Sequence, residues 1–109
     1  MAFDETLDER IRTALVRKKG IESRKMFGGI CFLLNGNMLV GVWKEFLIVR
    51  LGPDQGDDAL REPNVRPMDI TGKPMKGWIM VEPKGVQDDD ALNDWIQRAV
   101  KFVVKLPAK

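Results

Sequence analysis

The stretch from Lys25 to Leu51, KMFGGICFLLNGNMLVGVWKEFLIVRL, is the longest apolar region of the chain and constrains its fold most. Within it, Asn35-Gly36 separates two hydrophobic runs. Asn-Gly is the strongest short-range signal for a β-hairpin, because both central residues of a type I′ turn need a positive φ. A second reversal is expected at Lys44-Glu45, where two charges interrupt MLVGVW and FLIVRL. The stretch therefore predicts an antiparallel β-meander at the centre of the fold.

These two turns predict which residues share a face of the sheet. A two-residue turn at Asn35-Gly36 pairs Phe32 with Leu39, and a turn at Lys44-Glu45 pairs Trp43 with Phe46. One face is then wholly apolar, and we expect helices to cover it: Cys31, Leu33, Met38, Val40, Val42, Leu47, Val49 and Leu51. The opposite face carries Ile30, Phe32, Leu34, Asn37, Leu39, Gly41, Trp43, Phe46, Ile48 and Arg50.

The second face is also mostly apolar, which a sheet with one solvated face would not show. It is therefore expected to be covered by another segment of the chain, by a second subunit, or by a ligand over Gly41 beside Arg50. A one-residue slip, such as a three-residue turn with Gly36 in the left-handed conformation, would exchange part of the face assignments. Both faces would remain apolar after such a slip.

Helical patterns flank this meander. Residues 4–19 place Leu7, Ile11, Ala14 and Leu15 on one stripe, with Asp4 as the cap and Gly20 as the stop. Residues 88–106 form a second stripe of Leu92, Trp95, Ile96, Ala99, Val100 and Val103. A short helix is expected over 54–62, an edge-like strand over 21–27, an extended piece over 68–70, and a last strand over 78–82. The predicted fold is α+β in two layers, an antiparallel meander sheet of about five strands with N- and C-terminal helices and one short helix.

Composition excludes several classes of function. The chain has 109 residues, which suits one domain over 1–109, with a net charge of +2, no histidine and one cysteine. Histidine-based catalysis and a histidine or multi-cysteine metal site are excluded, and no catalytic residue, metal or cofactor is expected. Asp88–Asp90 are interpreted as helix-capping residues, and Cys31 as a small core residue. With no apolar run long enough for a membrane and no secretory signal, we expect a cytoplasmic protein.

Five blocks in order carry a family resemblance: Lys25-Met26-Phe27-Gly28-Gly29, Asn35-Gly36-Asn37-Met38 with Gly41-Val42, Val49-Arg50-Leu51-Gly52, Arg66-Pro67-Met68-Asp69, and Pro74-Met75-Lys76-Gly77-Trp78. In the order and residues of these five blocks, the chain resembles the N-terminal domain of the TfoX/Sxy family of bacterial competence regulators. The resemblance implies an antiparallel sheet with helices packed on it, similar to secretion-chaperone-like domains. It also implies a regulatory role linked to transcription, and it supplies no catalytic residues.

Three functional hypotheses follow. The first is a non-catalytic module that binds a protein, such as a component of the transcription machinery, and forms a homodimer. Its expected interaction face comprises Phe32, Leu39, Gly41, Trp43, Phe46 and Ile48. The alternative is a small-molecule or anion site, which could be enzymatic, formed by Lys25, Arg50, Arg66 and Lys76 beside glycines. Direct nucleic-acid binding is the third and is disfavoured, because neither long helix is rich in recognition residues.

Overall fold

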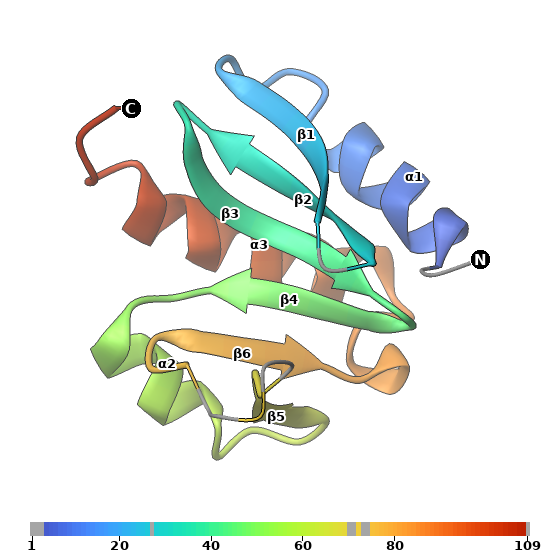
Figure 1. Cartoon of the computed structure of the whole chain (residues 1–109). Helices are drawn as coiled ribbons and strands as arrows, with labels where there is room; N and C mark the ends of the chain where they lie inside the picture. The colour runs from blue at the N-terminus through green and yellow to red at the C-terminus, as the bar shows by residue number, and fades with distance from the viewer. Residues whose placement is uncertain (1–3, 27, 70–71, 73–74, 109) are drawn as a thin grey trace.

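The computed structural model describes residues 4–26, 28–69, 72 and 75–108, and these form one antiparallel sheet with helices against it (Figure 1). The six strands lie in the order β1-β2-β3-β4-β6-β5. Their bounds are β1 Ile21–Met26, β2 Gly29–Leu34, β3 Asn37–Trp43, β4 Phe46–Arg50, β5 Val65–Pro67 and β6 Trp78–Val81. The helices are α1 Glu5–Ala14, α2 Pro53–Ala59 and α3 Asp89–Val103, with a 3-10 turn η1 at Pro83–Gly85.

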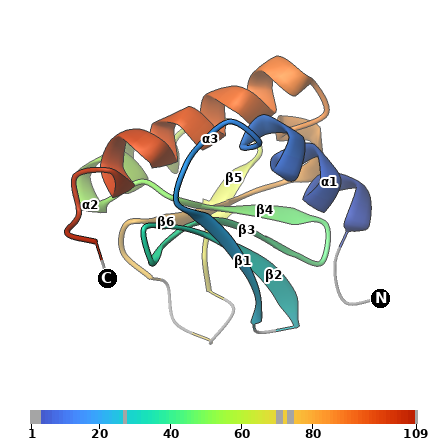
Figure 2. The same ribbon diagram turned by 90° about the horizontal axis from the view of Figure 1, so that it is seen from above.

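All three α-helices lie on one side of the sheet (Figure 2). The two-layer α+β prediction is therefore confirmed, with six strands where about five were expected. The additional strand is β5, which pairs Val65 with Val81. The extended piece was expected at residues 68–70, but the strand lies just before Met68, and Ile70 lies outside the described residues. We name the side of the sheet away from the helices the open face.

Both turns of the meander are confirmed. Asn35 and Gly36 have φ of 52° and 85°, as a type I′ turn requires, and they join β2 to β3. Lys44 adopts φ of 55° in the second turn, where Trp43 pairs with Phe46 as predicted. A left-handed lysine is uncommon. The apolar strands on either side therefore select the reversal at Lys44 more strongly than its own turn propensity does.

The pairing of β2 with β3 follows the predicted register next to the turn, where Leu34 pairs with Asn37. The prediction is wrong from Phe32 onwards, because the register shifts by one residue. Leu33 pairs with Met38, but Phe32 pairs with Val40, so Leu39 is an extra residue on β3. Such a bulge places two successive side chains on one side of the sheet. Leu39 and Val40 are both buried in the core under the helices.

The shift reverses the face assignment of β2. Ile30, Phe32 and Leu34 point to the helices together with Val40, Val42, Leu47 and Val49. Cys31, Leu33 and Met38, which pairs with Leu33, lie on the open face instead of the helix side that the sequence predicted. The assignments for β4 and for β3 after the bulge are as predicted, since Gly41 pairs with Ile48 and Trp43 with Phe46. Phe32 and Leu39 are therefore core residues and not members of the second face.

The two long helices bury the stripes that the sequence predicts. In α3, Leu92, Trp95, Ile96, Ala99, Val100 and Val103 are all buried. In α1, Leu7 and Ile11 are buried, and the Asp4 carboxylate caps the helix by accepting from the backbone N–H groups of Thr6 and Leu7. The helix ends at Ala14, earlier than the sequence suggested, because the chain turns after Leu15 to reach the edge of the sheet.

Phe32 and Phe46 provide a test of the face assignment. Phe32 is 1% exposed in the core, so Phe32→Ala should lower the free energy of unfolding by about 3–5 kcal/mol. Phe46 is half-buried on the open face, so Phe46→Ala should cost about 1–2 kcal/mol. Urea denaturation measures both values. Equal costs for the two substitutions would contradict the shifted register.

Candidate functional site

The open face carries an aromatic cluster that is only partly covered. Ile48, Met68 and Met80 are buried at its base, and Trp43, Phe46 and Trp78 pack around them while remaining half-buried. We call these six residues the open-face cluster. Large apolar side chains in one contiguous exposed group are the usual mark of a binding surface on a soluble domain. This cluster is therefore the candidate functional site.

Strand pairing explains why these side chains meet. Ile48 pairs with Met80, and Trp43 pairs with Phe46 across the β3–β4 turn, so all four point to the same side. The rings of Trp43 and Phe46 stack with centroids 6.2 Å apart and an interplanar angle of 21°. Aromatic pairs in such geometry add about 0.5–1.5 kcal/mol beyond the area they bury. The site is thus a preformed part of the sheet.

Three cations lie over the aromatic rings of the cluster. The Arg66 guanidinium lies 5.3 Å from the Phe46 ring centroid, and the Lys44 ammonium lies 4.6 Å from that of Trp43. Arg50 lies 5.2 Å from the Trp78 centroid. Positions within about 6 Å of a ring face are attractive through the ring quadrupole. The cluster is therefore apolar at its base, with three cations over its aromatic rings.

Arg50 is the most enclosed of these cations. Its guanidinium also lies 5.8 Å from the ring centroid of Phe102, and it donates to the backbone carbonyl oxygen of Met38 at 3.4 Å. Burial lowers the pKa of Arg50, although a guanidinium remains protonated in proteins. Arg50 and Arg66 form no ion pair with a carboxylate among the described residues. Both retain N–H donors for an external acceptor.

The structure does not bring the four cations of the predicted anion site together. Arg50 and Arg66 share the open face on either side of β6, and exposed Lys76 lies in the turn that precedes this strand. Lys25 is on β1, at the opposite edge of the sheet from β5 and about 24 Å away. It also points to the helix side, since it pairs with Ile30. The four residues do not line one site.

The predicted interaction face is only partly on the open face. Gly41, Trp43, Phe46 and Ile48 lie there, whereas Phe32 and Leu39 are in the core. Sequence reasoning missed Trp78, Met80 and Met68. In a strand over WIMV, Trp78 and Met80 point to the same side. Only the position of β6 beside β4 shows that this side is the open face.

Cys31 also lies on the open face but is buried. A Cβ at Gly41 would be 2.8 Å from the Ile30 carbonyl oxygen and 3.5 Å from the Cys31 sulfur, so the thiol fills the space beside this glycine. Burial raises the pKa of the Cys31 thiol. The group is therefore a neutral, protected thiol rather than a nucleophile.

Cys31 should react slowly with a thiol reagent such as Ellman's reagent at neutral pH, because it is neutral and 3% exposed. Denaturation in guanidinium should make the same thiol react at the rate of a free cysteine. The absorbance change of the reagent follows both reactions. Fast labelling of the native protein would contradict the burial of Cys31.

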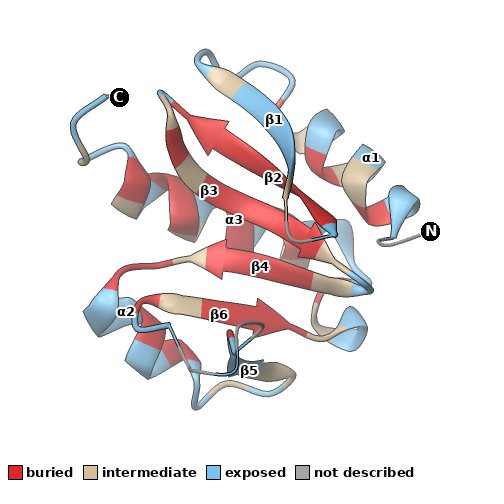
Figure 3. Ribbon diagram, in the orientation of Figure 1, coloured by how far each residue is buried: buried red, intermediate tan, exposed pale blue. Residues whose placement is uncertain are grey.

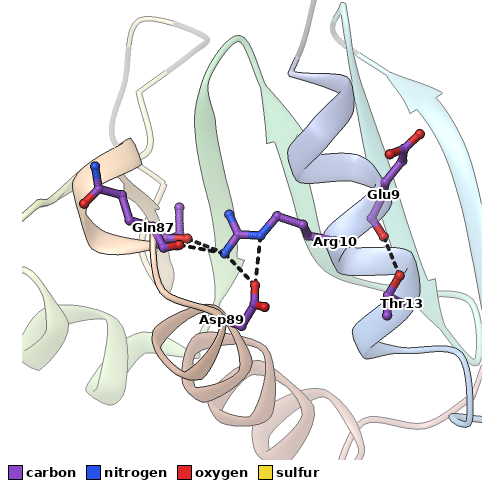
Figure 4. Close-up of polar contacts among 6 residues, drawn as sticks. Glu9, Arg10, Thr13, Gln87 and Asp89 are labelled. Carbon is purple, nitrogen blue, oxygen red and sulfur yellow. Dashed lines mark hydrogen bonds and ion pairs between the residues drawn. The ribbon is translucent and has the colours of Figure 1, made fainter.

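A second polar site lies between α1 and α3 (Figure 4). Arg10 reaches from α1 to the start of α3, where it forms an ion pair with Asp89 at 3.0 Å. It also donates to the backbone carbonyl oxygens of Val86 and Gln87, at 2.6 Å and 3.3 Å. The groove beside it has a volume of about 320 Å³. Because the protein's own acceptors hold the guanidinium, this site acts as a clamp between the helices.

Replacing Arg10 should therefore affect stability. Arg10→Met should lower the free energy of unfolding by about 1–3 kcal/mol, because two carbonyl groups and one carboxylate lose a charged donor. Arg17→Met is the matched control, since Arg17 is exposed in the turn after α1 and forms no ion pair among the described residues, so its replacement should cost about 0.5 kcal/mol or less. Urea denaturation compares the two. A cost of Arg10→Met no larger than that of Arg17→Met would rule out the clamp.

Metal and membrane features are limited in the described part of the chain. No group of three or more acidic or cysteine side chains there could hold a metal ion. Asp88 occupies the N-cap position of α3 without a side-chain cap hydrogen bond, and Asp89 and Asp90 lie in the first turn, where the positive end of the helix dipole favours negative charge. None of the helices in this part combines the length and apolarity that crossing a bilayer requires.

The fold and the site together define a small α+β domain with a sheet face left open. The family model of the TfoX N-terminal domain matches residues 13–103, from the last turn of α1 to the end of α3. The chain belongs to the TfoX N-terminal domain family, which is not a known enzyme family. No curated protein matches the chain, and no solved structure does.

Proposed function

We propose that this domain is a non-catalytic protein-interaction module whose open-face cluster binds an acidic segment of a partner protein. In this proposal an apolar side chain of the partner packs on Trp43, Phe46 and Trp78, and carboxylates beside it pair with Arg50 and Arg66. The family supports a regulatory role, and the proposed partner is a component of the bacterial transcription machinery in the cytoplasm.

The composition of the cluster supports protein binding. Tryptophan, phenylalanine, methionine and arginine are the residue types enriched in the buried centres of protein interfaces. Tryptophan and arginine are also the commonest energetic hot spots. The open-face cluster and the arginines over it combine all four types within one sheet face.

The charge around the cluster supports an acidic partner, and this observation carries the proposal. Arg66 over Phe46 and Arg50 over Trp78 have no carboxylate partner among the described residues. A guanidinium stacked on a ring keeps its N–H edge available for bidentate binding of a carboxylate. The strand positions of this cluster carry no acidic side chain.

The proposal that the domain is non-catalytic rests on which reactive side chains its sequence contains. It has no histidine to act as a general base near neutral pH, and its one thiol is buried with a raised pKa. The sequence thus lacks an imidazole base, and its thiol is not accessible as a nucleophile.

Affinity capture with purified variants tests this proposal. A partner captured from bacterial lysate should be confirmed with purified components, and Trp43→Glu should weaken its binding by about tenfold or more, because a central tryptophan contributes strongly to an interface. Arg66→Glu should weaken it too, and more at low salt than at high salt. The matched control is Val16→Glu, which changes an exposed apolar residue in the turn after α1. Isothermal titration calorimetry measures the affinities.

The identity of the binding segment provides a further check. Peptide mapping should find an acidic segment that contains an apolar residue. A partner that binds Trp43→Glu as tightly as the wild type would contradict the proposed surface. A basic binding segment would contradict the proposed role of the two arginines.

A further inference from the structure

The two edge strands of the sheet differ in how well they are protected. β5 is three residues long and contains Pro67, and both features prevent pairing with another chain. β1 has six residues in unbroken register with β2, with no proline and no bulge. Figure 3 shows β1 mostly exposed beside the buried β2, and β1 is the first strand in the order of the sheet. β1 is therefore the edge that is open to pairing.

The direction of the free backbone groups of β1 follows from one hydrogen bond. The Asn35 N–H donates to the Gly20 carbonyl oxygen at 2.9 Å, in the same register as the β1–β2 pairs. Hydrogen-bonded and non-hydrogen-bonded pairs alternate along an antiparallel ladder. Ile21, Ser23 and Lys25 therefore direct their N–H and C=O groups away from β2, towards the open edge.

A second copy of β1 can satisfy these groups in an antiparallel, two-fold arrangement centred on Ser23. Ser23 then forms a hydrogen-bonded pair with its own copy, and Ile21 pairs with Lys25 of the other copy on each side. All three outward-facing residues find partners in this register. A register centred on Arg24 overlaps as much of β1 but pairs only Ser23 and Lys25 among its outward-facing residues.

The same register also places side chains of opposite charge next to each other across the interface. Glu22 and Arg24 lie on the open face at opposed, non-hydrogen-bonded positions, where the Cα atoms of two strands approach to about 4.5 Å. Each Glu22 thus faces Arg24 of the other copy, and this occurs twice. Within one chain the two residues form only a long pair of 3.6 Å between side chains that are both 63% exposed. A register centred on Arg24 would instead place two arginines opposite each other.

We infer that the domain forms a homodimer through antiparallel pairing of β1 with β1 of a second copy, centred on Ser23. The two sheets become one continuous sheet, and the Glu22–Arg24 pairs select the register. Both open-face clusters lie on the same side of this sheet, because the two-fold axis is perpendicular to it. The dimer does not depend on the proposed function, and it leaves both clusters accessible to partners.

Charge reversal tests the register directly. Glu22→Arg would oppose two arginines and Arg24→Glu two glutamates, so each variant alone should have a dimer dissociation constant raised about tenfold or more. An equal mixture of the two variants should recover the wild-type affinity. In the mixed dimer, both positions of the Glu22→Arg chain are basic and both positions of the Arg24→Glu chain are acidic, so opposite charges face each other twice. Sedimentation velocity of fluorescently labelled chains measures both the homodimers and the mixed dimer.

Three outcomes of this experiment would overturn the inference. They are a wild-type protein that stays monomeric at about 100 μM, a dimer that neither single variant weakens, and a mixture that does not recover. Trp43→Glu should leave the dimer intact, so failure of the β1 interface is distinguishable from failure of the proposed function.

A covalent test fixes the centre of the interface. In the inferred dimer the two Ser23 Cα atoms are about 5.5 Å apart, within the range of a disulfide. Ser23→Cys should therefore form a disulfide-linked dimer under mild oxidation, while buried Cys31 does not compete. Lys25→Cys is the matched control, because its two copies would lie about 14 Å apart along the strands. Equal cross-linking of both variants on a non-reducing gel would exclude the centre at Ser23.

Discussion

The one-residue shift in register between β2 and β3 decides which side chains of this protein meet the helices. Because Leu39 is an extra residue, Leu39 and Val40 both enter the core, and Phe32 turns inward with them. Without the bulge the alternation of β2 would be reversed, and the core would lose Phe32, the largest of the fully buried side chains among the described residues. The remaining apolar residues of β3 and β4 would still face α3 as they do now. Because of the bulge, the side chains of Ile30, Phe32 and Leu34 on β2 pack in the same core as those of β3 and β4.

The open face owes its aromatic character to the same arrangement. With Phe32 and Leu39 taken into the core, the aromatic residues that the structure describes on this side come from the ends of β3 and β4 at their turn and from β6. They gather on one half of the sheet, where Arg50 and Arg66 lie over their rings. The other half carries Cys31 and Leu33 beside the charged strand β1. The two halves therefore suit different partners, an acidic segment at the cluster and a second copy at the edge.

Much of the fold could be predicted from local patterns. Asn35-Gly36 defined the first hairpin, Asp4 the start of α1, and the apolar stripe of α3 its buried side, because each depends on a few neighbouring residues. Of the predicted interaction face, Gly41, Trp43, Phe46 and Ile48 lie together, since the β3–β4 register follows from its turn. The full pairing of β2 with β3 could not be predicted. When both faces of a strand are apolar, a bulge does not interrupt any pattern of apolar and polar residues in the sequence.

The sequence by itself determined the two-layer fold, the meander and the apolar nature of both sheet faces. The tertiary structure alone decided which side chains of β2 face the helices and that Leu39 joins them, because both depend on the register shift between β2 and β3. It also decided that Trp78, Met80 and Met68 complete the open-face cluster, and that Lys25 lies far from the other cations. These placements join segments distant in the chain, and no local propensity encodes their contacts.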